Sequence, residues 1–167
     1  MKVVFQMFWR ICLLRQSPAY VPTQSAFVAA VVVANLLISI LVSLSVDRGA
    51  DPLIVSTRIV VSQATYACLV WLAAYLREYP GRFTGTLTAL FGCDAMITAT
   101  FGLIVPLLSA LDGRIINVLS IGFLAWTLAV AGFILSKALS VHIGIGVLLA
   151  LGMMVLSVAA GNTAIGV

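Results

Sequence analysis

The chain has 167 residues, of which 63% are hydrophobic and only 8% are charged. Nine Lys and Arg with five Asp and Glu cannot cover the surface of a soluble domain of this length, which excludes a water-soluble protein. The net charge of +4 does not indicate nucleic-acid binding, because the basic residues lie singly at segment ends instead of forming a cluster.

The first 22 residues are expected to form an interfacial segment. Met1 to Arg15 mix apolar, aromatic and basic side chains, a composition typical of a short helix that lies in the membrane interface. A mobile tail is the alternative. Pro18 and Pro22 prevent the helix from continuing and should turn the chain into the bilayer.

Five apolar segments are each long enough to supply the roughly 20 helical residues that cross a bilayer. We expect these spans at about residues 24–46, 53–76, 83–108, 115–135 and 143–160. The connectors are short, and the first three carry the Gly, Pro or Asp residues that turns favour. The sequence therefore predicts one all-α membrane domain over residues 1–167, a bundle of five transmembrane helices preceded by an interfacial helix.

Charge asymmetry gives the expected orientation, since Lys and Arg accumulate on the cytoplasmic side of short loops. With the N-terminus in the cytoplasm, Arg48 and Arg114 lie outside and Arg58 falls within a span. The basic residues left on the cytoplasmic side are Lys2, Arg10, Arg15, Arg77, Arg82 and Lys137. This bias predicts a cytoplasmic N-terminus and an external C-terminus, and with loops this short it fits a bacterial inner membrane.

Small residues recur at helical spacing in the third and fourth spans. Membrane helices associate through close backbone approach, so such stripes indicate packing faces. We expect these two helices to form the tight centre of the bundle. The third span contributes Thr84, Thr88, Gly92, Ala95, Ala99 and Gly102, and the fourth contributes Gly122, Ala125, Ala129, Gly132 and Ser136.

Asp94 is the first candidate for function, because it lies near the middle of the third span. A charged side chain at that depth costs at least about 2.5–3.5 kcal/mol, so it usually faces a protein partner or a water-filled path. Arg58, in the second span, lies at a depth from which its long side chain could reach Asp94. We expect an Arg58–Asp94 ion pair, supported by Ser62, Thr65 and Thr98.

Three interpretations of that pair stay open at this point. The pair could fix helix register, it could form only in a complex with another protein, or Asp94 could take part in a proton or ion relay. A polar, water-accessible Asp94 would favour transport, whereas an Asp94 sealed against Arg58 would favour a structural or docking role.

Enzyme chemistry is not expected. It needs a nucleophile beside a base, a metal cluster or paired carboxylates, and the sequence contains none of these patterns. Cys12, Cys68 and Cys93 form no metal-binding spacing, and His142 has no acidic residue or cysteine beside it. We therefore expect no metal, no cofactor and no catalytic residue.

The segment from Arg82 to Gly92, followed by Pro106, resembles the third-helix region of small bacterial Yip1-domain-like membrane proteins. The stretch Leu13-Leu14-Arg15 with Pro18 and Pro22 resembles their entry into the membrane. The resemblance covers about a quarter of the chain and implies five spans and a role in membrane organisation or trafficking.

The sequence thus favours a non-enzymatic membrane subunit or scaffold that docks other membrane proteins. Its expected partners are the lipid bilayer and either other membrane proteins in a hetero-complex or further copies of itself. The alternative is a small oligomeric transporter, or an ion- or proton-conducting protein, that uses Asp94.

Overall fold

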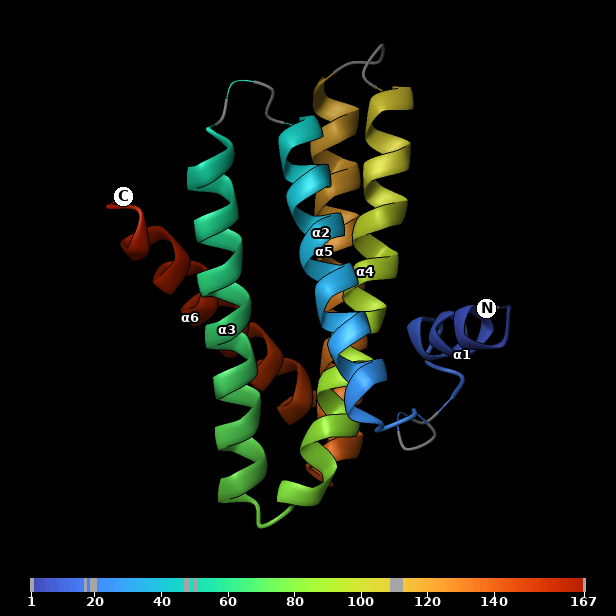
Figure 1. Ribbon diagram of the computed structural model, residues 1–167. Coiled ribbons are helices and arrows are strands. Elements are labelled where there is room, and N and C mark those ends of the chain that lie inside the picture. Colours follow the sequence, from blue (N-terminus) through green and yellow to red (C-terminus); the bar gives the residue numbers. More distant parts are fainter. Residues whose placement is uncertain are drawn as a thin grey trace.

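The computed structural model describes residues 2–16, 18, 21–46, 49, 51–108 and 113–166, and of residues 2–3, 106–108 and 113–116 it describes the backbone only. These residues form helices and turns, which confirms the predicted all-α class. In chain order (Figure 1), the elements are α1 (Lys2–Cys12), α2 (Ser25–Val46), α3 (Pro52–Leu76), the short 3-10 helix η2 (Pro80–Arg82), α4 (Phe83–Leu108), α5 (Gly113–Ala138) and α6 (Ile143–Ala164).

The five long helices match the five predicted spans. Each of α2 to α6 is long and apolar enough to cross a membrane. Local capping explains two of the boundaries: Asp51 accepts a hydrogen bond from the Leu53 amide at 2.8 Å before α3, and His142 accepts one from the Gly144 amide at 3.2 Å before α6. Of the predicted connectors, residues 47, 48, 50 and 112 lie outside the described residues, and Pro52 and Gly113 already belong to α3 and α5.

The long helices form two groups. In Figure 1, α2, α4 and α5 run side by side, while α3 stands apart and packs on α6, which crosses the bundle obliquely. Helix α4 packs most extensively on α2, and α5 packs most extensively on α6. The expectation that the third and fourth spans form the tight centre differs from this arrangement, because each makes its closest contacts with another helix.

The glycines explain this pairing. A Cβ added at Gly92 would overlap the Phe8 ring of α1, and one added at Gly102 would overlap Val42 of α2. Gly132 and Gly146 bring the backbones of α5 and α6 together in the same way. Of the predicted stripe, Thr88, Gly92, Ala95, Gly132 and Ser136 are buried, Thr84, Ala99, Gly102 and Ala129 are half-buried, and Gly122 and Ala125 are exposed.

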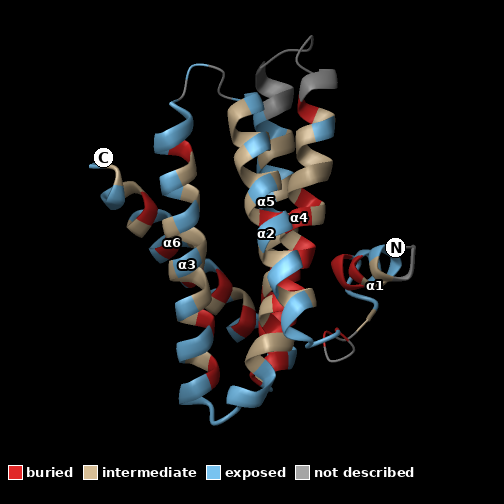
Figure 2. Ribbon diagram, viewed as in Figure 1, coloured by how far each residue is buried: buried red, intermediate tan, exposed pale blue. Residues whose placement is uncertain are grey.

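Helix α1 is a packed part of the bundle. It lies across the long helices in Figure 1, and its apolar face, formed by Phe8, Ile11 and Cys12, is buried (Figure 2). The indole Nε1 of Trp126 in α5 donates a hydrogen bond of 3.0 Å to the Cys12 carbonyl, which satisfies an acceptor at the end of α1. Residues 2–12 of the first predicted segment are therefore helical, and α1 contacts α4 and α5.

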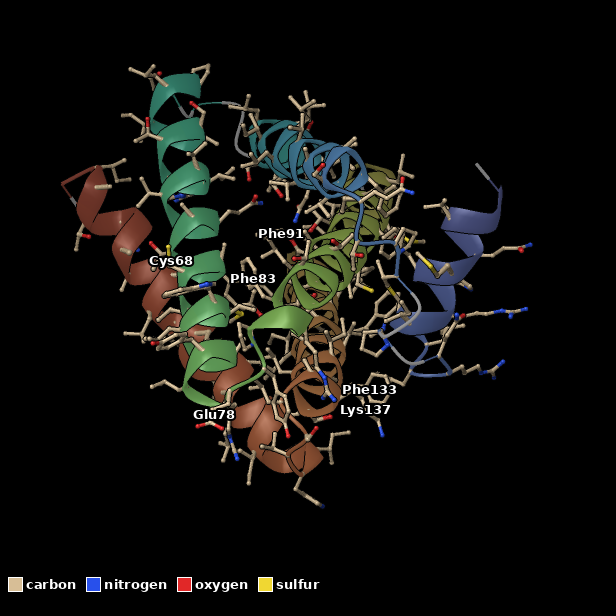
Figure 3. The ribbon with its side chains drawn as sticks, turned by 60° about the horizontal axis from the view of Figure 1, so that its bottom comes forward. Cys68, Glu78, Phe83, Phe91, Phe133 and Lys137 are labelled. Atoms are coloured by element: carbon tan, nitrogen blue, oxygen red, sulfur yellow. The ribbon has the colours of Figure 1, made fainter. Side chains whose placement is uncertain are left out.

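One end of the bundle is polar and basic. Arg82 Nη1 donates hydrogen bonds to the Ala138 carbonyl at 3.3 Å and to Ser140 Oγ at 3.1 Å. These bonds join the connector before α4 to the connector after α5. Glu78 and Lys137 lie at the same end, which Figure 3 turns toward the viewer.

Candidate binding site

Two polar side chains meet in the middle of the bundle. Asp94 lies near the middle of α4, and Asn35 lies near the middle of α2, where its side chain is completely buried. Asn35 Nδ2 donates a hydrogen bond of 3.2 Å to Asp94 Oδ2. Among the residues described, Asn35 is the one donor to this carboxylate.

A chain of hydrogen bonds continues from Asn35 to α3. Ser39 Oγ donates to Asn35 Oδ1 at 3.1 Å, and Gln63 Nε2 approaches both Asn35 Oδ1 at 3.5 Å and Ser39 Oγ at 3.3 Å. A carboxylate only accepts hydrogen bonds, so the orientation of the Asn35 amide, and then that of Gln63, follows from Asp94. The network thus links α2, α3 and α4 in one layer.

This orientation leaves an acceptor without a donor. Gln63 Oε1 is buried and has no hydrogen-bond partner in the described structure. A buried acceptor without a donor costs about 1–3 kcal/mol, so such an atom calls for an explanation. Gln63 also borders a cavity.

A cavity of about 180 Å³ lies between α3, α4, α5 and α6. Its wall is mostly apolar, with contributions from Phe91, Ile97, Leu128 and Ala131. The polar side chains that line it are Ser62, Gln63, Tyr66, Asp94, Thr127 and Ser157. A mostly apolar cavity with a few convergent polar groups is the usual form of a small-molecule site.

None of the described residues that line the cavity has a cationic side chain. The expected Arg58–Asp94 pair does not occur in the described structure: Arg58 is exposed on α3, and its Cγ lies against Gly161 of α6. Asp94 bonds to Asn35 instead. The sequence gives the depth of Arg58 along its helix, but the direction in which a side chain leaves the helix depends on how that helix packs.

The three supporting residues have different surroundings. Ser62 lines the cavity and lies close to Gly161. Thr65 and Thr98 are half-buried and are not among the residues that line the cavity. The structure therefore brings Ser62 to the site of Asp94 and leaves Arg58, Thr65 and Thr98 outside it.

Sequence reasoning missed Asn35 and Tyr66. Asn35 is the one side-chain amide in α2, and its position near the middle of an apolar helix is the signal that identifies it. Tyr66 follows Gln63 by three residues, so both side chains leave α3 on the same face. The sequence pattern therefore identifies both residues as candidates. The pairing of Asn35 with Asp94 depends on the packing of α2 on α4, which the sequence pattern does not give.

The chemistry that the site offers is acceptance of hydrogen bonds and of positive charge. In the described part of the chain, no group of three or more His, Cys, Asp or Glu side chains is placed to hold a metal ion. Asp94 supplies carboxylate oxygens and Gln63 a side-chain amide, and the polar lining also includes the hydroxyls of Ser62, Tyr66, Thr127 and Ser157.

Comparison with known proteins gives no relative: no protein-family model, no curated protein and no solved structure matches the chain.

Proposed function

We propose that this protein is a small integral membrane carrier that binds a solute in the cavity beside Asp94 and moves it across the bilayer. The observation that carries the proposal is a carboxylate in the middle of five apolar helices that lines a cavity and has no cationic partner there. Intramembrane acids of this kind mark substrate or ion pathways, because their cost has to be offset by a function.

The position of Arg58 supports this function over a purely structural charge pair. A structural pair needs both charges in contact, since removing one partner leaves the other uncompensated. Arg58 is exposed and lies against α6, whereas Asp94 faces the cavity. A positively charged ligand can therefore compensate the charge of Asp94.

The distribution of basic residues supports the proposed orientation. Arg77, Arg82 and Lys137 are exposed at the end of the bundle where Arg82 joins the two connectors. Placing this end in the cytoplasm follows the rule that Lys and Arg accumulate there. We propose a cytoplasmic N-terminus, an external C-terminus and a bacterial inner membrane as the location.

The test is uptake of radiolabelled solutes into proteoliposomes that contain the full chain. The vesicles are challenged with inward gradients of four kinds of solute: a primary amine, an alcohol, a carboxylate and sodium ion. Wild-type vesicles are expected to respond to at least one solute faster than vesicles with Asp94→Asn. Asp51→Asn is the matched control, because Asp51 is an exposed helix cap that Asn can replace.

Equal responses from wild-type and Asp94→Asn vesicles for all four solutes would contradict the carrier function. The folding of Asp94→Asn is checked by circular dichroism and by its elution volume in detergent. A folded but inactive variant supports transport, and loss of folding alone points to a structural role.

A second function, the non-enzymatic subunit or scaffold, is favoured by a different observation. Only 11% of the most apolar part of α2, and the same share of α3, is buried within the chain. These outer faces are available to lipid and to the helices of other membrane proteins, and the resemblance to Yip1-domain-like proteins agrees with such docking. Affinity purification in mild detergent with mass spectrometry tests it: stoichiometric partners support the subunit, and purification with copies of itself alone counts against it.

A further inference from the structure

The cavity beside Asp94 has acceptors that lack donors. Asp94 Oδ2 receives one hydrogen bond, from Asn35, and no described residue donates to Oδ1. Gln63, a second polar residue of the wall, has a buried amide oxygen to which no described residue donates. A ligand group that carries several hydrogen-bond donors suits a carboxylate with a free oxygen.

The charge of the site also favours a ligand that donates hydrogen bonds. Among the described residues that line the cavity, Asp94 is the one acidic residue, and none is Lys, Arg or His. A charged ligand group that donates hydrogen bonds to a carboxylate forms shorter and stronger bonds than a neutral one. An ammonium group supplies both the donors and the positive charge.

The remaining wall restricts the body of the ligand. It is formed mainly by aliphatic side chains from α4, α5 and α6 together with the rings of Phe91 and Tyr66. An apolar cavity of about 150 Å³ holds benzene, so a volume of about 180 Å³ takes a body of similar size. Aromatic rings beside a carboxylate also attract a cation through their negative faces.

We propose that the cavity binds a small primary amine in its ammonium form, with a compact apolar body. The ammonium group donates to Asp94, and the apolar body fills the space between α4, α5 and α6. This assignment rests on the proposed carrier function and names its substrate class. A bare alkali-metal ion offers no apolar surface to the aliphatic wall, and a neutral alcohol leaves the carboxylate uncompensated.

Isothermal titration of the purified full chain in detergent tests the assignment with benzylamine and benzyl alcohol as probes. The two probes have the same ring and differ in the charged group. Benzylamine is expected to bind about tenfold or more tightly, because it alone makes a charge-assisted bond with Asp94. Sodium chloride is titrated separately and is expected to give no heat of binding.

Two variants separate the charge from the apolar space. Asp94→Asn is expected to remove the preference for benzylamine and to leave benzyl alcohol binding within about twofold of wild type. Ala131→Leu places extra side-chain volume in the cavity and is expected to weaken both probes, while Ala125→Leu, at an exposed position on the same helix, is expected to weaken neither.

Equal affinity for the two probes, or a preference that survives Asp94→Asn, would overturn the ammonium assignment. If Asp94→Asn does not fold, Ala131→Leu decides: unchanged benzylamine binding means that the amine lies elsewhere. The two proposals fail differently in the flux assay. An Asp94-dependent response to the alcohol, the carboxylate or sodium, without one to the amine, rejects the amine and leaves the carrier function standing.

Discussion

Asn35 of α2 donates a hydrogen bond of 3.2 Å to the carboxylate of Asp94 in α4. This bond joins the middles of the two helices that pack most extensively in their half of the bundle. It also fixes the direction of the amide chain through Ser39 to Gln63, which leaves Gln63 Oε1 without a donor. One pair of residues thus serves both helix packing and the site.

The coupling of Asn35 and Asp94 can be measured with a double-mutant cycle. Asn35→Leu is expected to lower the free energy of unfolding by about 1 kcal/mol, because it leaves the carboxylate without a donor. Asn35→Leu combined with Asp94→Leu is expected to cost less than the sum of the single changes. Unfolding in bicelles gives the three values, and additivity within about 0.3 kcal/mol would mean that the bond contributes nothing.

Arg58→Leu distinguishes the observed arrangement, in which Arg58 does not contact Asp94, from the ion pair that the sequence predicted. Arg58 is exposed and does not pair with Asp94, so its loss is expected to change the free energy of unfolding by no more than about 0.5 kcal/mol. Breaking a buried pair costs about 3–5 kcal/mol instead. If Arg58→Leu lowers the free energy of unfolding by about 3–5 kcal/mol and the Arg58→Leu/Asp94→Leu double variant does not, the ion pair with Asp94 does form.

The crossing of α5 and α6 gives a third prediction. A Cβ at Gly146 would overlap the Gly132 carbonyl and lie 3.0 Å from the Ser136 amide nitrogen, and these backbone atoms cannot turn aside. Gly146→Ala is therefore expected to destabilise the fold by about 1–3 kcal/mol. Gly152, on the same helix, has no atom within 4 Å of its added Cβ, so Gly152→Ala is the matched control and is expected to leave the midpoint of unfolding unchanged or raised.

Docking of α1 on α4 predicts a specific cross-link. Cys12 Sγ lies 3.9 Å from the Cys93 carbonyl oxygen, and Cys93 Sγ lies 3.9 Å from that of Phe8. The two buried thiols therefore lie close together where α1 contacts α4. Mild oxidation by copper phenanthroline is expected to link Cys12 to Cys93, detected by mass spectrometry of tryptic peptides.

Cys68 is the internal control for that cross-link, because it is exposed on α3. Linkage of Cys12 to Cys68 in place of Cys93 would contradict the position of α1. Cys12→Ser is expected to abolish the linked peptide and to leave the fold intact.

The long helices could be predicted from the sequence because hydropathy and length together determine them. The expected span at 83–108 coincides with α4, and the one at 53–76 begins one residue after α3 does. The fourth helix ends later than expected, at Ala138, because residues 136–138 are compatible with a helix and no Gly or Pro stops it there. The position of Asp94 near the middle of α4 was likewise predictable from its place in an apolar run.

The partner of Asp94 was not predictable in the same way. The pairing with Arg58 assumed that helices joined by a short connector stay in contact along their length. Helices α3 and α4 instead diverge from their connector, and α4 packs on α2 while α3 packs on α6. The neighbours of a residue near the middle of a helix depend on such crossing angles, which glycines such as Gly102 and Gly146 determine through contacts distant in sequence.

Because α5 and α6 cross closely at Gly146, a small rotation of α6 about this point moves its far end by a larger distance. From Gly146 to its end at Ala164 the helix extends about 27 Å at 1.5 Å per residue, so a rotation of about 10° at the crossing displaces the far end by about 5 Å. Helix α3 packs on α6 and carries Gln63 and Tyr66, two of the residues that line the cavity. A small angular change at one glycine would therefore be magnified into a change in the width of the space beside Asp94.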